Sequence, residues 1–391
     1  MEISIIIPCL DEAETIDKVV KDAFIGGLKT GKRFEVIVAD NGSTDGSIDI
    51  ARRAGARVVS ISDKGYGAAI IGGVNSANGE IIVMADADDS YELENLNKFT
   101  EVIQNGFDLV VGNRFKGGIE KGAMPFLHRY LGNPILSLLG RIFFKIKLGD
   151  FHCGMRGFSK SKFKTLNINS SGMEFASEMI AKFALSGSKI AEVPTILRPD
   201  GRTRKPHLRT WRDGWRHLRF LLVFSPGWLF YIPGLILLGI GSSLIVIDAF
   251  TKIMVFGKEV QVLGTIIASM LIITGVQIMW LESILHSAGN AMGVMLSDTP
   301  SKKIDRYALG LEKTLLLTIF IQIVSTLWVI SIYLKWRNGE LNNFQPENRI
   351  KLATLYLMLT SVNLISFTSS FAVYFFKNST LNSDKSTDSI K

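Results

Sequence analysis

Two acidic residues, Asp86 and Asp88, follow an apolar run, Ile81–Ala85, that predicts a buried strand. Two carboxylates this close repel each other unless a cation lies between them. A hard divalent cation such as Mg²⁺ or Mn²⁺ suits them, because it is commonly held by one or two carboxylates together with substrate phosphates. The pair therefore predicts a site where a metal ion and a phosphorylated ligand meet, and the alternative is an acidic turn in solvent.

Two further polar clusters, Pro8–Glu12 and Asp40–Asp45, also follow apolar runs. The strands predicted in this half of the chain are Ile3–Ile7, Glu35–Ala39, Arg57–Ser60, Ile81–Ala85 and Asp108–Val111. Helical patterns separate them, among them one over Asp45–Ala54, and this alternation predicts a mostly parallel sheet covered on both faces. Ligands bind beyond the carboxyl ends of such strands. We therefore expect the three polar clusters at one edge of the sheet.

The net charge of +8 is concentrated in one segment of the chain. Its basic residues are Arg198, Arg202, Arg204, Lys205, Arg209, Arg212, Arg216 and Arg219. A basic block beside apolar runs is expected to face anionic lipid headgroups or phosphates. Nucleic acid is the competing interpretation, but no other feature of the sequence supports it, so we expect no nucleic-acid partner.

Long apolar runs dominate the sequence after residue 220. The predicted membrane spans are Phe224–Ile247, Val262–Trp280, Thr314–Leu334 and Leu352–Phe375, each near the ~20 residues that cross a bilayer. The chain is therefore expected to be a multi-pass integral membrane protein. Its N-terminus shows no signal peptide, so the first domain is expected in the cytoplasm. The basic connection between the second and third spans fits this orientation, whereas the next connection fits it poorly.

Leu208–Leu222 has apolar residues at helical spacing opposite arginines, which predicts an interfacial helix, or alternatively a helix packed on the first domain. The expected organisation is a cytoplasmic catalytic domain over residues 1–207, the interfacial helix over 208–223 and a membrane domain over 224–376. The polar residues 377–391 are expected to form a disordered tail.

Residues 1–225 contain a series of different motifs, each occurring once. In chain order they are Ile5–Glu12, Val38–Asp45, Gly65–Ala69, Asp86–Asp88, Gly112–Phe115, Asp150–Phe158 and Glu192–Pro194. This series resembles glycosyltransferase family 2, specifically the polyprenyl-phosphate sugar synthases related to dolichol-phosphate mannose and glucose synthases. The resemblance implies an α/β nucleotide-diphospho-sugar transferase domain of the GT-A, Rossmann-like class, followed by an all-α transmembrane domain.

By this resemblance, nucleotide-binding residues would be Pro8, Glu12, Asp40 and Asp86. Asp86 and Asp88 would hold Mg²⁺ or Mn²⁺ and the diphosphate, and would be catalytic together with Arg114. Ser90 replaces the glutamine that often supplies a third metal ligand in relatives, so two protein ligands are expected. The residues expected to bind the acceptor phosphate are Arg114, Arg129, Asn133, Arg156, Arg198 and Arg204.

The implied reaction is metal-dependent transfer of a hexose from a UDP- or GDP-hexose to undecaprenyl or dolichyl phosphate at the cytoplasmic membrane face, with inversion. A phosphate acceptor is already anionic at neutral pH and needs no general base, whereas Asp150 would be the base for a hydroxyl acceptor. One alternative is a processive polysaccharide synthase, which usually carries Gln-x-x-Arg-Trp where this chain has Arg209–Asp213. Another is a non-catalytic lipid-sugar flippase or assembly partner. A homo-oligomer in the membrane remains open.

Overall fold

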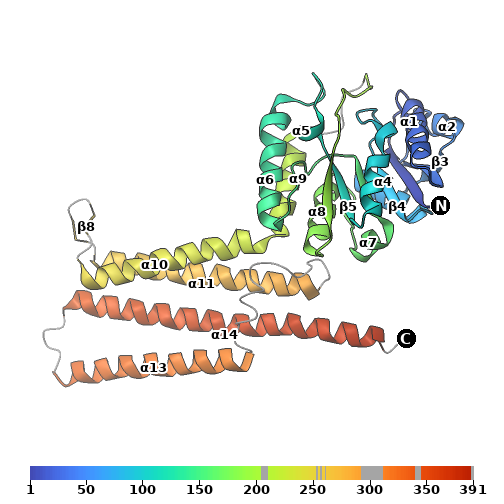
Figure 1. Cartoon of the computed structure of the whole chain (residues 1–391). Coiled ribbons are helices and arrows are strands. Elements are labelled where there is room, and N and C mark those ends of the chain that lie inside the picture. Colours follow the sequence, from blue (N-terminus) through green and yellow to red (C-terminus); the bar gives the residue numbers. More distant parts are fainter. Residues whose placement is uncertain are drawn as a thin grey trace. The chain divides into compact units, whose positions relative to one another are not determined.

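The computed structural model describes residues 1–203, 210–251, 254–255, 258–259, 261–291, 311–339 and 345–388. The chain divides into two compact units, Met1–Phe224 and Ser225–Lys391. The first unit is a sheet flanked by helices, and the second is built from long helices (Figure 1).

A seven-stranded sheet forms the centre of the first unit. Its strands are β1 (Ile3–Cys9), β2 (Phe34–Asp40), β3 (Arg57–Ser60), β4 (Ile81–Met84), β5 (Leu109–Asn113), β6 (Arg156–Ser159) and β7 (Ile190–Pro194). They lie in the order β3-β2-β1-β4-β6-β5-β7, and only β6 runs antiparallel to its neighbours. The predicted α/β class and mostly parallel sheet are confirmed. The sequence pattern missed β6 and β7, and β6 places an arginine and a glycine among its four residues, so no apolar run marks it.

The helices of the first unit connect and cover these strands. They are α1 (Ile16–Lys29), α2 (Ser47–Arg53), α3 (Tyr66–Ser76), η1 (Leu93–Asn95), α4 (Asn97–Gln104), α5 (Arg114–Gly117), η2 (His128–Gly132), α6 (Asn133–Phe144), α7 (Lys160–Thr165), α8 (Phe175–Leu185) and α9 (Thr210–Val223). α2 confirms the helix expected over Asp45–Ala54. α9 packs against α6 and α8 within this unit (Figure 1), as the alternative interpretation of the amphipathic segment expects.

Close packing of α3 on the sheet depends on Gly73. A Cβ atom at Gly73 would lie 2.7 Å from Ile6 Cγ2 and 3.3 Å from Ala39 Cβ. Ile6 and Ala39 belong to the neighbouring strands β1 and β2, and both are fully buried. The missing side chain therefore lets α3 approach the two strands whose ends carry the polar clusters.

Four helices of the second unit are long and apolar enough to cross a membrane: Gly227–Phe250, Val262–Ala291, Leu311–Arg337 and Pro346–Phe376. Each coincides with one predicted span, so the four long apolar helices are confirmed. The underlying elements are η3 (Gly227–Tyr231), α10 (Ile232–Phe250), α11 (Gln261–Ala291), α13 (Leu311–Arg337) and α14 (Pro346–Asp388), with the short strands β8 (Met254–Val255) and β9 (Lys258–Glu259). α14 continues through residues 377–388, where a disordered tail was expected, since no glycine or proline follows Pro346 to end it.

Small residues and paired polar groups hold these long helices together. A Cβ at Gly234 in α10 would lie 2.8 Å from the Gly275 carbonyl oxygen in α11, so the two helices meet backbone to backbone. Asp248 in α10 accepts a hydrogen bond from Thr265 at 2.7 Å and pairs with Lys351 of α14 at 2.8 Å. Polar groups at membrane depth must find such partners within the protein.

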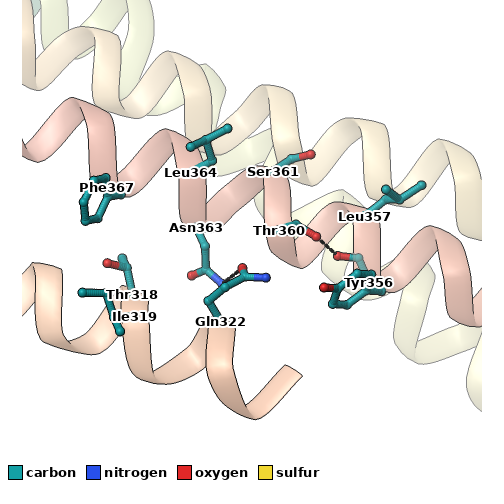
Figure 2. Close-up of a pocket in the computed structure, with 10 residues that line it drawn as sticks. All are labelled: Thr318, Ile319, Gln322, Tyr356, Leu357, Thr360, Ser361, Asn363, Leu364 and Phe367. Carbon is teal, nitrogen blue, oxygen red and sulfur yellow. Dashed lines mark hydrogen bonds between the residues drawn. The ribbon is translucent and has the colours of Figure 1, made fainter. Parts of the chain in front are cut away.

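A groove of about 460 Å³ lies between α13 and α14 (Figure 2). Asn363 of α14 donates to Gln322 of α13 at 3.3 Å, and the Tyr356 hydroxyl lies 3.2 Å from Thr326 Oγ1. Interhelical hydrogen bonds of this kind stabilise membrane helix pairs by roughly 0.6 kcal/mol each. We therefore interpret the polar side chains beside this groove as contacts that join the two helices.

We predict that Gly73→Ala lowers the thermal stability of the first unit. The added methyl group collides with Ile6, and overpacking a well-packed core costs about 1–3 kcal/mol, which exceeds the gain of up to ~1 kcal/mol in helix propensity. The measurement is the thermal unfolding of the full chain in detergent micelles. Asn75→Ala, on the exposed side of α3, is the matched control and should not lower the transition. Equal transitions for both variants would contradict the packing argument.

Candidate functional site

The three polar clusters lie at one edge of the sheet. β2, β1 and β4 are neighbours and run parallel, so their carboxyl ends point the same way. Cys9 at the end of β1 pairs in register with Asp40 at the end of β2. Thr15 Oγ1, beyond β1, donates to the Ala87 carbonyl between Asp86 and Asp88 at 2.6 Å. The expected meeting of these strand ends is therefore confirmed.

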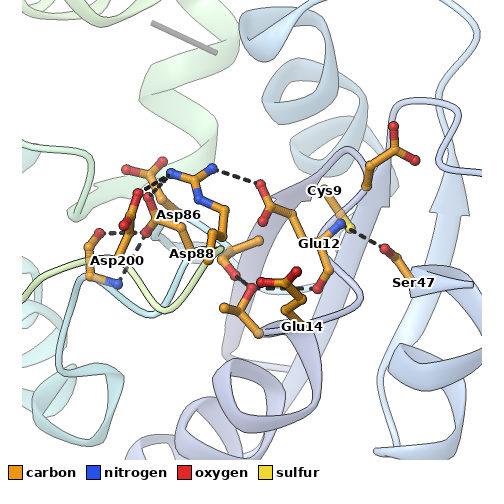
Figure 3. Close-up of polar contacts among 12 residues, drawn as sticks. Cys9, Glu12, Glu14, Ser47, Asp86, Asp88 and Asp200 are labelled. Atoms are coloured by element: carbon orange, nitrogen blue, oxygen red, sulfur yellow. Dashed lines mark hydrogen bonds and ion pairs between the residues drawn. The ribbon is translucent and has the colours of Figure 1, made fainter. Parts of the chain in front are cut away.

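Hydrogen bonds tie the loop after β1 to the loop after β2. The Asp11 amide donates to Ser43 Oγ at 2.9 Å, and the Thr44 amide donates to the Asp11 carboxylate at 2.7 Å. The Glu12 amide donates to Ser47 Oγ at 2.8 Å. Both loops are thereby held in one arrangement, and Figure 3 shows Glu12 and Ser47 of these loops in the same polar cluster as Asp88.

Pro8 and Asp40, two of the predicted nucleotide-binding residues, are buried. The Asp40 carboxylate accepts hydrogen bonds from the amides of Gly42 at 3.0 Å and Ser43 at 3.1 Å, and its exposed fraction is 2%. Asp40 thus shapes the turn after β2, as the sequence indicates for an aspartate before Asn-Gly. Its contact with a base stays a prediction.

Asp86 lies just beyond β4 in a confined setting. Its carboxylate accepts a hydrogen bond from the Tyr66 hydroxyl at 2.9 Å. Burial and the neighbouring charge of Asp88 raise the pKa of Asp86 to about 6, although the Tyr66 hydrogen bond and the charge of Arg114 act in the opposite direction. Burial and repulsion from Asp88 thus disfavour negative charge on Asp86.

Asp88 is the second carboxylate of the pair. Its Oδ1 accepts hydrogen bonds from the Ser90 amide at 3.1 Å and the Ser90 hydroxyl at 2.5 Å. Among the described residues, no cluster of three or more His, Cys, Asp or Glu side chains could hold a metal ion. Asp86 and Asp88 nonetheless fit a hard cation as a pair of oxygen ligands, with water and phosphate completing the coordination.

A cation of the protein itself lies on this carboxylate edge. We call residues 197–203, which follow β7, the strap. Arg202 of the strap donates to Glu12 Oε1 at 3.0 Å, to Asp88 Oδ2 at 2.8 Å and to Asp200 Oδ2 at 3.1 Å. Figure 3 shows the carboxylates of Glu12, Asp88 and Asp200 turned toward this one guanidinium group. The edge is thus built to hold positive charge.

Arg114 opens α5 directly after β5 and forms a bidentate pair with Asp150. Its Nε and Nη2 donate to the two oxygens of Asp150 at 2.6 and 2.8 Å. Both residues are buried, and the pair does not include Nη1 of Arg114. A fork-to-fork pair of this type holds the guanidinium plane in one orientation.

Asp150 cannot serve as the general base that a hydroxyl acceptor would need. Its exposed fraction is zero, and both oxygens already accept from Arg114, while the His152 amide donates to Oδ1 at 3.2 Å. A carboxylate in this environment orients Arg114. That alternative role for Asp150 is therefore corrected by the structure.

Arg156 is buried and bound by main-chain carbonyl oxygens, and its contact with an acceptor phosphate stays a prediction. Its exposed fraction is 1%, and its guanidinium donates to the carbonyl oxygens of Phe151, Cys153 and Ala176 at 2.8–3.0 Å. The chain around 151–153 turns back on itself before β6, and Arg156 satisfies the carbonyls left unpaired there. The sequence motif identified an important arginine but not its partners.

Arg129 and Asn133 lie in η2 and at the start of α6. The Arg129 guanidinium is 5.6 Å from the centre of the Tyr130 ring. Burial and, after it, the charge of Arg114 lower the pKa of His128, so η2 lies within electrostatic reach of Arg114. Among the described residues, no hydrogen bond joins Arg129 or Asn133 to Arg114. Their contact with an acceptor stays a prediction.

Arg198 lies in the strap and pairs with Glu92. It is partly exposed, with a side-chain exposed fraction of 39%, so it remains accessible to a ligand. Arg204 lies outside the described residues.

Sequence reasoning missed two participants. Tyr66 lies within the Gly65–Ala69 motif, but its hydrogen bond to Asp86 depends on the packing of α3 against the sheet. Arg202 is one arginine in a basic segment, and no sequence signal separates it from its neighbours. Both become visible only when distant parts of the chain meet.

Comparisons with known proteins show which family and which proteins this chain resembles. Residues 4–166 match the model of the family described as glycosyl transferase family 2. The low-salt glycan biosynthesis hexosyltransferase Agl6 of Haloferax volcanii is 36% identical over 285 residues, which cover 71% of this chain and 66% of Agl6. The chain thus spans just under two thirds of that relative.

The dolichyl-phosphate hexose transferase of Haloferax volcanii is 32% identical over 198 residues, covering 50% of this chain and 83% of the relative. Among solved structures, glucosyl-3-phosphoglycerate synthase from Mycobacterium tuberculosis, in complex with Mn²⁺, UDP and phosphoglyceric acid, has a TM-score of 0.44 and 22% identity. That comparison covers 56% of this chain and 77% of the synthase.

The family match includes β1 to β6, and therefore Glu12, Asp40, Asp86, Asp88 and Arg114 at the carboxylate edge. The similarity to the dolichyl-phosphate hexose transferase extends over most of that protein. The chain is therefore a member of glycosyltransferase family 2.

Proposed function

We propose that this chain transfers a hexose from a UDP- or GDP-hexose to a polyprenyl phosphate at the cytoplasmic face of a membrane, with inversion at the anomeric carbon. The observation that carries the proposal is that Asp86 and Asp88, which follow β4, lie at the same edge of the sheet as Arg114, which follows β5, because both strands run antiparallel to β6 between them. The two carboxylates suit a metal-bound diphosphate, and the arginine suits an anionic acceptor.

The donor side is the edge formed by β1, β2 and β4. Pro8, Glu12 and Asp40 would line the nucleotide, and Asp86 and Asp88 would hold Mg²⁺ or Mn²⁺ with the diphosphate. The bound metal ion would neutralise charge on the leaving diphosphate. The protein contributes position, because the cross-tied loops hold these groups before the donor arrives.

The acceptor side favours a phosphate over a hydroxyl group. Asp150 is committed to Arg114 and is fully buried, so it offers no base for a hydroxyl. A phosphate monoester needs none, because its oxygen is already anionic near neutral pH. Arg114 keeps Nη1 outside its pair with Asp150, which leaves a donor for that oxygen. Arg129, Asn133, Arg198 and Arg204 are the further candidates around it.

A lipid-borne acceptor is supported by an apolar stripe along η2 and α6. Leu127, Leu131, Ile135, Leu138 and Ile142 recur at helical spacing and are all exposed, with fractions of 39–49%. Such a stripe is typical of a helix lying in a membrane interface. The stripe begins beside the candidate acceptor residues in η2, and two relatives are named as a dolichyl-phosphate hexose transferase and a dolichol-phosphate mannosyltransferase.

We predict that Asp88→Asn abolishes sugar transfer to lipid. Membranes that contain the chain are given radiolabelled UDP- and GDP-sugars, polyprenyl phosphate and Mg²⁺ or Mn²⁺, and the label in the organic phase is measured. The variant should lose more than about 100-fold, because changing even an outer-shell partner of a metal ligand typically costs 10–100-fold. Asp49→Asn, on the exposed face of α2, is the control and should keep activity.

Other distributions of the label would support the competing functions. Label only in an insoluble polymer would indicate a processive polysaccharide synthase. No metal-dependent transfer from any donor would contradict the proposal and favour the flippase or assembly role.

We also predict that Gly154→Ala weakens metal binding without unfolding the protein. A Cβ at Gly154 would lie 2.1 Å from Asp86 Oδ2, so the carboxylate must move. The apparent KM for Mn²⁺ should rise by about tenfold, within the range seen when supports of a metal ligand are altered.

The control for this variant is Gly214→Ala in α9, where an added Cβ meets no atom within 4 Å. Thermal unfolding of neither protein should begin below that of the unaltered chain, and Gly214→Ala should gain up to about 1 kcal/mol in helix propensity. An unchanged KM for Mn²⁺ in Gly154→Ala would show that Asp86 does not hold the metal.

A further inference from the structure

The strap crosses the carboxylate edge and is bound to it along its length. The Arg198 amide donates to the Ser90 carbonyl at 3.0 Å, and the Gly201 amide donates to the Asp88 carbonyl at 2.9 Å. Thr203 donates through its amide and hydroxyl to Glu14 at 2.7 and 2.6 Å. These contacts bring the Arg202 side chain onto the predicted metal and nucleotide ligands.

Arg202 is the cation that compensates this edge. Its side chain is 12% exposed and contacts three carboxylates, those of Glu12, Asp88 and Asp200. Burial alone would lower the pKa of Arg202, but the charges of Asp88 and Glu12 outweigh burial and raise it. Within the described part of the chain, Arg202 Nε is buried and has no hydrogen-bond partner. The three carboxylates thus attract the Arg202 guanidinium strongly, but they leave its Nε without a hydrogen bond.

Arg202 and a metal ion require the same oxygen. Asp88 Oδ1 already accepts two hydrogen bonds from Ser90, and Oδ2 is the oxygen that faces Arg202. A divalent ion on Asp88 would also repel a guanidinium within ion-pair distance. The two cations therefore exclude each other at this carboxylate.

We propose that Arg202 is a built-in counter-ion that competes with the metal–nucleotide for Asp88 and Glu12 and must leave when the donor binds. The inference rests on the proposed function, in which Asp88 holds the metal and Glu12 contacts the nucleotide. Displacement frees a guanidinium group on the strap, which also carries the predicted acceptor residue Arg198. Donor binding thereby precedes and prepares the binding of the anionic acceptor.

The test is the affinity for Mn²⁺ of the full chain in detergent micelles, measured from the electron paramagnetic resonance signal of free Mn²⁺. UDP and GDP are each added in separate titrations. If the paired conformer makes up roughly nine tenths of the molecules, its removal in Arg202→Gln tightens apparent binding by about tenfold. The apparent Mn²⁺ affinity of Arg202→Lys should lie between those of the unaltered chain and Arg202→Gln, because an ammonium group lacks the planar fork that reaches two carboxylates.

Lys18→Gln is the matched control for loss of charge. Lys18 pairs with Asp89, next to Asp88, but does not contact Asp88 or Glu12. Its removal should change Mn²⁺ affinity by less than about twofold, as expected for an exposed pair. Equal tightening in Lys18→Gln and Arg202→Gln would reveal a general charge effect and overturn the proposal.

Two other outcomes separate this inference from the proposed function. If Asp88→Asn loses Mn²⁺ binding while Arg202→Gln binds no more tightly than the unaltered chain, the metal site stands and the counter-ion role is wrong. If the unaltered chain binds no Mn²⁺ with either nucleotide, the metal site itself is wrong and the counter-ion role falls with it.

Discussion

The gathering of negative charge at one edge of a parallel sheet is the constraint on which the rest of the catalytic unit depends. Parallel strands deliver Glu12, Asp86 and Asp88 to the same place, and uncompensated charge there is costly. In this structure, the Arg202 guanidinium pairs with Glu12 and Asp88, and the Tyr66 hydroxyl donates a hydrogen bond to Asp86. The same need for compensation makes the edge suitable for a metal ion.

Charge is also compensated on the proposed acceptor side, where Arg114 pairs with Asp150. The carboxylate of Asp150 neutralises the buried guanidinium of Arg114, and the bidentate pair fixes the direction of the remaining donor groups. Asp150 therefore acts through Arg114 instead of taking a proton. This division of labour suits chemistry in which both reacting groups carry phosphate and the protein mainly positions charges.

The second unit, whose long helices are apolar enough to cross a membrane, also supplies its buried polar groups with partners from the protein. Lipid offers no partner to a polar group, so Asp248 is bound by Thr265 and Lys351, and Gln322 is bound by Asn363. Close backbone contact at Gly234 and Gly275 also joins α10 and α11. Both units thus depend on satisfying polar groups where water is excluded.

The sequence by itself determined the α/β class, five strands, four long apolar helices and the positions of Asp86 and Asp88, because local apolar periodicity and the polar residues at each strand end carry these features. It missed β6 and β7, did not show the partners of Arg156 and did not single out Arg202. Each of these depends on partners far away in the chain: Arg156 on the Ala176 carbonyl, Arg202 on Glu12. Only the tertiary structure decides which group an arginine binds, because the carboxylate or carbonyl partner comes from a distant segment and the arginines of one basic segment cannot be told apart by sequence.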